Sequence, residues 1–117
     1  MAHPNKRKGT RAELLVVKWL RQFGWINAER SRAGWTDDRG DVDGIPGVCI
    51  EVKAEKQIDI PGYLRELETE MANARAWTGA VIIKRRGSED VDDWYAVMPA
   101  KVWGELLRML DRPTPSR

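Results

Sequence analysis

Carboxylates and a single lysine come together in the stretch from Gly40 to Ala54, as Asp41, Asp43, Glu51 and Lys53. Apolar and polar residues alternate from Val48 to Ala54, which is the period of a β-strand with one face in a core. Glu51 and Lys53 are two residues apart on this strand, so they point the same way. Carboxylate oxygens are the ligands that a hard divalent cation prefers. The stretch therefore predicts a metal site with an ammonium group beside it.

The turn before this strand decides whether Asp41 can reach Glu51. If the hairpin loop is 46–47, Asp41 faces Val52 and lies on the opposite face from Glu51. If the loop is 45–47, Asp41 faces Glu51 directly. Three-residue loops with a glycine at the left-handed position are common in hairpins. A metal site therefore predicts the three-residue loop or an equivalent bulge.

Two aspartates compete for the position across the hairpin. Asp41 and Asp43 share a face, so the alternation alone leaves the choice open. We take Asp41 as the metal ligand, because it lies across from Glu51 in the predicted register, and Asp43 as the reserve ligand. The other interpretation of Asp43 is a surface or turn acid.

An apolar helical stripe predicts a first helix from Thr10 to Phe23, and this helix carries Glu13. Thr10 and Glu13 also have the spacing of a capping box, in which the threonine caps the helix and the glutamate bonds back to it. The residues by themselves therefore favour a capping role for Glu13 over a role in chemistry.

The sequence of Asp41, an interval of about ten residues and then Glu51-Val52-Lys53 resembles the catalytic signature of the PD-(D/E)XK nuclease superfamily. Two further features make the chain similar to the archaeal-type Holliday junction resolvases, which include phage-encoded forms. They are the run Arg7-Lys8-Gly9-Thr10-Arg11-Ala12-Glu13, followed by an apolar helix, and the pair Arg30-Ser31. The resemblance covers roughly residues 7–54 well and the remainder only by pattern.

This resemblance implies a metal-dependent nuclease site. Asp41, Glu51 and the backbone carbonyl of Val52 would bind Mg²⁺, with Mn²⁺ as a substitute, and Glu13 would bind a second metal or steady Lys53. Lys53 would orient the attacking water or stabilise the charge of the transition state. A lysine between carboxylates stays protonated, because nearby opposite charge favours the charged form. Lys53 therefore suits charge stabilisation better than general-base catalysis.

The remaining pattern predicts an α/β fold with a restriction-endonuclease-like core, a central mixed sheet flanked by helices. Beyond the first helix and the hairpin, the expected elements are a short strand, a helix, two strands and a last helix, at 25–29, 59–77, 80–84, 94–98 and 100–110. The order is αβββαββα, or αβββαβ with a C-terminal helix. Three acids of the second helix are most simply solvated: Glu66, Glu68 and Glu70.

Length and composition predict one folded domain, because 117 residues can bury a single core. We expect a basic N-terminal arm at 1–9, a nuclease domain at 10–111 and a flexible tail at 112–117. One cysteine, Cys49, excludes an internal disulfide, and a single histidine, His3, leaves no zinc ligand set. No apolar run reaches the ~18 residues of a membrane span. We therefore expect a cytoplasmic protein, in a prokaryotic host if the resemblance holds.

The formal net charge is only +2, yet the cations gather in clusters that could form a basic face. Arginine and lysine side chains pair with phosphate oxygens. The candidate DNA contacts are Lys6, Arg7, Lys8, Arg11, Arg30, Ser31, Arg32 and Arg39. A solvated surface position is the alternative for each cation, and Ser31 is included because it matches the resolvases' Arg-Ser pair.

Together these predictions favour a metal-dependent DNA endonuclease that resolves four-way junctions by paired nicks. Symmetric cutting implies a C2 homodimer, with an apolar patch including Trp94, Tyr95 or Trp103 as a candidate face. The alternatives are a PD-(D/E)XK endonuclease on flaps, duplexes or replication intermediates, and a non-catalytic DNA-binding module on the same fold. For the acidic constellation, the alternative is an ion pair of Glu51 and Lys53 on a solvated sheet face.

Overall fold

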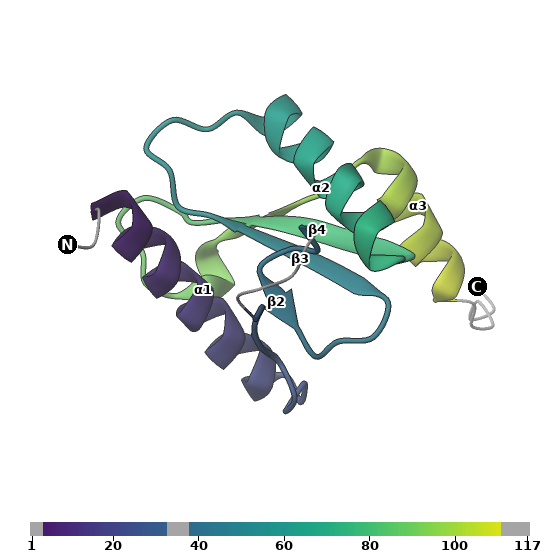
Figure 1. The fold of residues 1–117 in the computed structure, drawn as a ribbon, viewed down its shortest axis with the longest axis horizontal. Coiled ribbons are helices and arrows are strands. Elements are labelled where there is room, and N and C mark those ends of the chain that lie inside the picture. The colour runs from purple at the N-terminus through teal and green to yellow at the C-terminus, as the bar shows by residue number, and fades with distance from the viewer. Residues whose placement is uncertain (1–3, 33–37, 111–117) are drawn as a thin grey trace, which may run out of the picture.

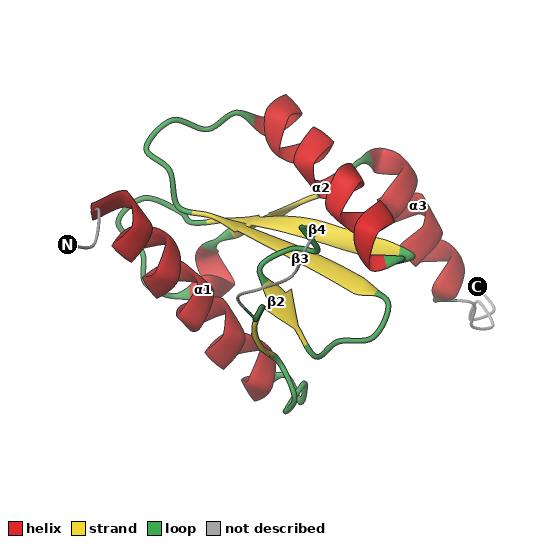
Figure 2. Ribbon diagram, in the orientation of Figure 1, coloured by secondary structure: helices red, strands yellow, loops and turns green. Residues whose placement is uncertain are grey.

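The computed structural model describes residues 4–32 and 38–110, with residues 4–8 described by their backbone only. In these ranges three α-helices flank a five-stranded mixed sheet, the α/β architecture that the sequence predicts (Figures 1 and 2). The elements are α1 (Pro4–Gln22), β1 (Glu29–Arg30), β2 (Val42–Asp43), β3 (Val48–Lys53), α2 (Ile60–Ala74), β4 (Thr78–Ile83), the 3-10 helix η1 (Val91–Asp93), β5 (Tyr95–Val97) and α3 (Ala100–Met109). No helix in these ranges is long and apolar enough to cross a membrane. The predicted tail at 112–117 lies outside them.

The strands lie in the sheet in chain order, β1-β2-β3-β4-β5. Neighbouring strands are antiparallel except β3 and β4, which are parallel. A parallel pair needs a long crossover, and α2 supplies it. This mixed sheet is compatible with the restriction-endonuclease-like core expected from the sequence.

Helices cover both faces of the sheet, with α1 on one side and α2 and α3 on the other (Figure 1). Val16 of α1 belongs to the core cluster that contains Ile50, whereas Leu67 of α2 belongs to the cluster that contains Cys49. Both faces of β3 are therefore buried, because its alternate residues pack on opposite helices. The face that carries Glu51 is not solvated, so the solvated ion-pair interpretation of this residue is wrong.

The hairpin between β2 and β3 has the three-residue geometry that the metal site requires. Val42 pairs with Ile50, which leaves residues 45–47 as the loop. The backbone N of Asp41 donates to the carbonyl of Ile50 at 2.8 Å, while the carbonyl of Asp41 accepts from Ser31 N, so the ladder is irregular at Asp41. Gly47 takes the left-handed backbone conformation, at φ 76°. Its position is also crowded, since an added Cβ would lie 2.6 Å from Cδ1 of Trp77. The predicted three-residue loop is confirmed, but Asp41 and Glu51 do not form a regular cross-strand pair.

The first helix begins six residues earlier than the apolar stripe predicts. α1 starts at Pro4, whose fixed φ suits the first turn of a helix, so Thr10 and Glu13 lie in its interior. The capping interpretation of Glu13 is therefore wrong. The apolar stripe missed this start because residues 4–9 are Pro-Asn-Lys-Arg-Lys-Gly and contain no apolar stripe. The helix also runs through most of the segment 1–9 expected as a basic arm.

The short strand expected at 25–29 is also displaced. Ala28 N donates to the carbonyl of Trp25, which closes a turn after α1, and β1 consists only of Glu29 and Arg30. Ile26, the apolar residue on which the prediction rested, is 76% exposed. An exposed apolar residue in a turn was therefore taken for the buried member of a strand.

The proposed apolar patch loses one of its three residues. Trp94 is buried, and its Nε1 donates to the carbonyl of Ser88 at 3.0 Å. Tyr95 on β5 and Trp103 on α3 are exposed, together with Leu107 on α3 and Leu110, which directly follows the helix. Trp103, Leu107 and Leu110 recur at helical spacing and share one face.

Candidate metal centre

Glu51 lies in the middle of the molecule, between β3 and α2. The residue is only 6% exposed, and Glu70 of α2 is 2% exposed. Tyr63, Leu67 and Glu70 are the buried residues of α2, and their helical spacing places Glu70 on the face that packs on the sheet. The expectation that Glu70 is solvated is therefore wrong. The spacing from Tyr63 through Leu67 was the sequence signal that could have found it.

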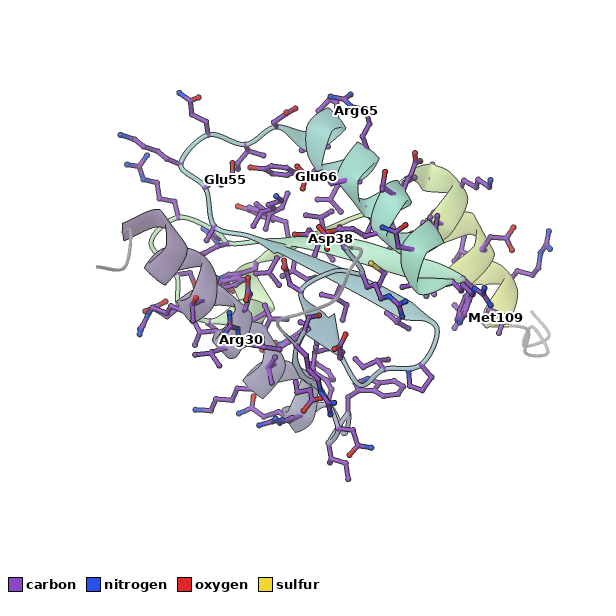
Figure 3. The ribbon with its side chains drawn as sticks, viewed as in Figure 1. Arg30, Asp38, Glu55, Arg65, Glu66 and Met109 are labelled. Carbon is purple, nitrogen blue, oxygen red and sulfur yellow. The ribbon has the colours of Figure 1, made fainter. Side chains whose placement is uncertain are left out.

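A third acid, Asp38, completes a carboxylate cluster with these two glutamates. One oxygen from each of Asp38, Glu51 and Glu70 lies within 4.8 Å of the other two. Asn73 of α2 donates from Nδ2 to the backbone carbonyl of Asp38 at 2.7 Å, which fixes the loop against the helix. Figure 3 shows Asp38 over the middle of the sheet beside α2. Sequence reasoning missed Asp38, because only the folded loop brings it to Glu51.

Three carboxylate oxygens of the two glutamates lack hydrogen-bond donors, whereas Oδ1 of Asp38 accepts from the backbone N–H of Gly40 at 3.0 Å. Oε2 of Glu51 and both carboxylate oxygens of Glu70 are buried, and no described residue donates a hydrogen bond to them. Burial, followed by the neighbouring Glu70 and Asp41, raises the pKa of Glu51. Burial also raises the pKa of Glu70, helped by Asp38 and Asp41 and opposed by Glu51. Buried carboxylates need a compensating charge, so this acidic triad could bind a metal ion.

Asp41 approaches Glu51 from the β2 side and is not a member of the triad. Its backbone N donates to the carbonyl of Ile50, and its Oδ2 accepts from the N–H of Val52, both at 2.8 Å. The N–H and C=O of one strand residue point to the same side. The Val52 carbonyl therefore also points toward the β2 side, past the end of β2. This placement is the one that the predicted ligand set of Asp41, Glu51 and Val52 requires.

Lys53 extends toward α2 from the same face of β3 as Glu51. Its Nζ lies 2.8 Å from Oε2 of Glu66, 3.7 Å from Oε1 of Glu55 and 5.1 Å from the ring centroid of Tyr63. Burial lowers the pKa of Lys53, but Glu66, Glu51 and Glu55 together outweigh burial and raise it. Lys53 is therefore an ammonium group at neutral pH. Its ion-pair partners are Glu66 and Glu55, so the expectation that Glu13 steadies Lys53 is wrong.

Glu13 lies on α1, near the other side of Asp41. Its Oε1 accepts from Nε of Arg30 at 2.9 Å. Burial and the charge of Asp41 raise the pKa of Glu13, while Arg30 opposes this rise. The structure thus brings Glu13 close to Asp41, and it pairs Arg30 with a carboxylate of the chain itself.

The reserve ligand Asp43 has a partner of its own. Oγ of Ser31 lies 3.1 Å from Oδ1 of Asp43 and 2.8 Å from the carbonyl oxygen of Gly40, so its single proton is shared between these acceptors. Asp43 is not a member of the acidic triad. Ser31 therefore ties the loop after β1 to β2, close to the site but outside it.

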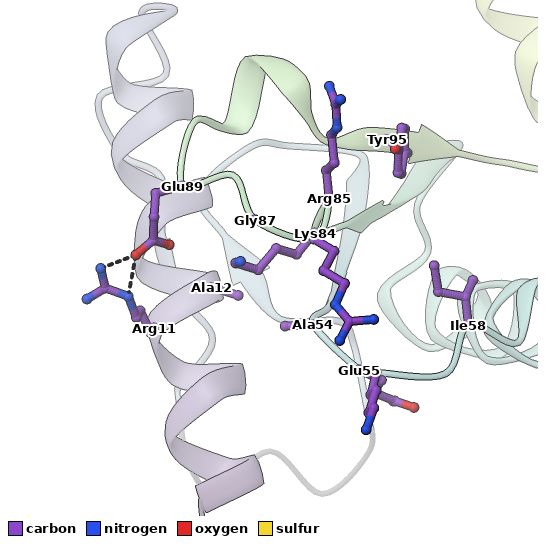
Figure 4. Close-up of a pocket in the computed structure, with 12 residues that line it drawn as sticks. Arg11, Ala12, Ala54, Glu55, Ile58, Lys84, Arg85, Gly87, Glu89 and Tyr95 are labelled. Carbon is purple, nitrogen blue, oxygen red and sulfur yellow. Dashed lines mark hydrogen bonds and ion pairs between the residues drawn. The ribbon is translucent and has the colours of Figure 1, made fainter.

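Beside the site, a hollow of about 770 Å³ is lined by more cations than acids (Figure 4). Its cations are Arg11, Lys56, Lys84, Arg85 and Arg86, and its acids are Glu55 and Glu89. Arg11 pairs with Glu89 across its rim. The backbone N of Lys84 donates to the carbonyl of Lys53 at 2.8 Å, so this basic hollow begins directly beyond Lys53.

The other predicted DNA contacts are scattered. Arg32 is exposed, with Nε 3.8 Å from Oε1 of Glu29, and Arg39 is half-buried beside β2. The side chains of Lys6, Arg7 and Lys8 lie outside the described residues. Sequence reasoning named Arg11 but did not name the cations of 56 and 84–86 as contacts, because their gathering depends on the parallel pairing of β3 with β4.

Comparison with family models, with curated proteins and with solved structures gives no match.

Proposed function

We propose that this chain is a metal-dependent DNA endonuclease that hydrolyses phosphodiester bonds, and that four-way junctions are its principal substrate. The observation that carries the proposal is the position of Glu51 and Lys53 on one covered face of β3, with Asp41 bonded to the residues on either side of Glu51, Ile50 and Val52. The resemblance of this constellation to the PD-(D/E)XK signature supplies the reaction class. The fold alone would not supply the reaction class, because one fold can host many functions.

Phosphodiester hydrolysis needs an activated water, neutralisation of developing negative charge and a held leaving group. Bound Mg²⁺, or Mn²⁺ in its place, would supply charge neutralisation and water activation. Asp41, Glu51 and the Val52 carbonyl would hold the ion, with Glu13 beside Asp41. Lys53, which carries a raised pKa, would direct a fixed positive charge at the phosphate rather than accept a proton.

A polyanionic substrate fits the surface next to this site. The basic hollow opens directly beyond Lys53 and concentrates five cations in a chain whose formal net charge is only +2. Phosphate contacts of this kind position DNA without reading its sequence. A substrate backbone lying in the hollow would therefore pass the Glu51 site.

Junction resolution requires two sites, so we propose a C2 homodimer. The exposed face of α3, with Trp103, Leu107 and Leu110, is the candidate contact surface. Tyr95 on the neighbouring edge strand would extend it.

The test is cleavage of a labelled four-way junction beside a linear duplex and a flap, with Mg²⁺ or with EDTA. Glu51→Gln is the test variant, and Glu68→Gln is the matched control because Glu68 is an exposed acid of α2. We expect paired nicks in the junction alone, lost with EDTA and in Glu51→Gln but kept in the control. Cutting of all three substrates would keep the nuclease and reject junction selectivity. Tight binding without metal-dependent cutting would favour the non-catalytic DNA-binding module.

A further inference from the structure

We infer that Glu51 is shared by two divalent-cation positions, one with Asp41 and the Val52 carbonyl, and a second with Asp38 and Glu70. The first position belongs to the proposed function, which this inference deepens. The second rests on separate observations. Both positions offer only oxygen ligands, which suits hard cations such as Mg²⁺ or Mn²⁺.

The acids reach Glu51 from two directions. Asp41 comes from the β2 side, where its Oδ2 is bonded to the N–H of Val52. Asp38 and Glu70 come from the α2 side, and their oxygens cluster with Glu51 in a set that excludes Asp41. Asp41 still raises the pKa of Glu51, so it lies within interaction distance of it. Glu51 therefore stands between two groups of ligands.

Glu70 is the residue that points to a ligand. Its side chain is almost fully buried, and neither carboxylate oxygen receives a hydrogen bond from any described residue. Lys53, a nearby ammonium group, is held by Glu66 instead, with Nζ 2.8 Å from Oε2 of Glu66. A carboxylate in this position is compensated by a cation or by a proton. We assign a cation to the Glu70 carboxylate.

The second position is both anchored and accessible. Asn73, one turn after Glu70 on α2, binds the carbonyl of Asp38 at 2.7 Å and so keeps this acid beside Glu70. A hollow of about 510 Å³ has Asp38, Glu66, Thr69 and Glu70 among its lining residues, and Asp38 is exposed while Glu70 is buried. A hydrated ion can therefore approach the second position from solvent through Asp38.

The test counts bound ions in the full chain without DNA, by calorimetric titration with Mn²⁺ near neutral pH. We expect two ions in the wild type and in the Glu68→Gln control, and one ion in Glu70→Gln and in Asp41→Asn. Electron paramagnetic resonance should detect magnetic coupling between two Mn²⁺ ions that share Glu51, and each single-site variant should lose it. Circular dichroism checks that the variants fold, and Asp38→Asn decides the outcome if Glu70→Gln does not fold.

One ion in the wild type, or two ions retained in Glu70→Gln, would overturn the inference and leave a proton shared by Glu51 and Glu70 as the explanation. The outcome is separable from that of the proposed function. Two bound ions without any DNA cleavage would reject the nuclease and support the second cation position. Junction cleavage with a single bound ion would keep the nuclease and reject the second position.

Discussion

Glu51 and Lys53 lie on one face of β3, yet their surroundings affect their charges differently. Burial and the adjacent carboxylates raise the pKa of Glu51, so this acid takes up a proton readily unless a cation displaces it. The pKa of Lys53 is raised because carboxylates surround its ammonium group. The site thus combines an acid that requires a cation with a lysine that keeps its charge.

Replacing Lys53 by methionine should remove charge stabilisation while preserving the metal ligands. We expect the cleavage rate to fall about 10²–10³-fold, the usual cost of removing one preorganised donor to transition-state charge. DNA affinity should change little, and a rate within a few-fold of wild type would remove Lys53 from the mechanism. Single-turnover cleavage measures the effect, with Lys101→Met, an exposed lysine of α3, as the control.

The stability of the metal-free protein should fall as pH rises. The pKa values of Glu51 and Glu70 lie above their usual value of 4.5 in the folded state, so above that pH the folded chain holds protons that the unfolded chain has released. Each group then contributes a loss of up to ~1.4 kcal/mol per pH unit. Urea unfolding in EDTA between about pH 5 and pH 8 measures this slope.

Glu70→Gln should flatten this pH dependence, whereas Glu68→Gln should leave it unchanged. Added Mg²⁺ or Mn²⁺ should stabilise the wild type increasingly as pH rises, because bound cations require deprotonated carboxylates. Equal slopes for wild type and Glu70→Gln would mean that Glu70 does not hold a proton in the folded metal-free protein.

The β2–β3 hairpin sets the register on which the site depends. Gly47 and Gly87 both have positive φ, but an added Cβ would meet Trp77 only at Gly47 and nothing within 4 Å at Gly87. Both alanine variants should lose about 1–2 kcal/mol for the left-handed backbone. Gly47→Ala should lose more and also bind Mn²⁺ more weakly. Equal losses in urea unfolding would show that the Trp77 contact does not constrain the hairpin.

The basic hollow at the ends of β3 and β4 should contribute to DNA affinity. Replacing Arg85 and Arg86 together by alanine should weaken DNA binding and lower the slope of log affinity against log salt by about 1–2. Fluorescence anisotropy in EDTA measures binding apart from cleavage. The control replaces Lys101 and Arg108, two exposed cations of α3. An unchanged salt slope in the hollow variant would place the DNA elsewhere.

Local patterns predicted the elements that carry local signals. The alternation from Val48 to Lys53 predicted β3, because strand period is written in adjacent residues. The Pro46-Gly47 turn allowed a loop of two or of three residues, and only the metal-site hypothesis selected the three-residue loop that the structure has. Glu70 and Asp38 escaped prediction, because their burial depends on α2 packing over the sheet and on the loop that Asn73 anchors. Of the three acids of the cluster, Glu51 was therefore visible in the sequence, and Asp38 and Glu70 required tertiary structure.

At the scale of the whole molecule, α3 presents an exposed apolar face. Trp103 is 56% exposed and aligns with Leu107 and with Leu110, which directly follows the helix. Trp103→Asp should convert the proposed homodimer into monomers in sedimentation analysis, whereas Ile26→Asp, at an exposed residue of the turn after α1, should not. A variant that sediments as the wild-type dimer would place the interface elsewhere.

The decisive measurement is cleavage of a supercoiled plasmid carrying an extruded cruciform, with Mg²⁺, by wild type and by Glu51→Gln. Two coupled sites produce linear plasmid from paired nicks within one binding event, and uncoupled sites produce nicked circles first. We expect linear product from the wild type and uncut plasmid from Glu51→Gln. A wild-type protein that binds the cruciform in the presence of Mg²⁺ or Mn²⁺ and leaves the plasmid supercoiled would contradict the assignment of an endonuclease site at Glu51.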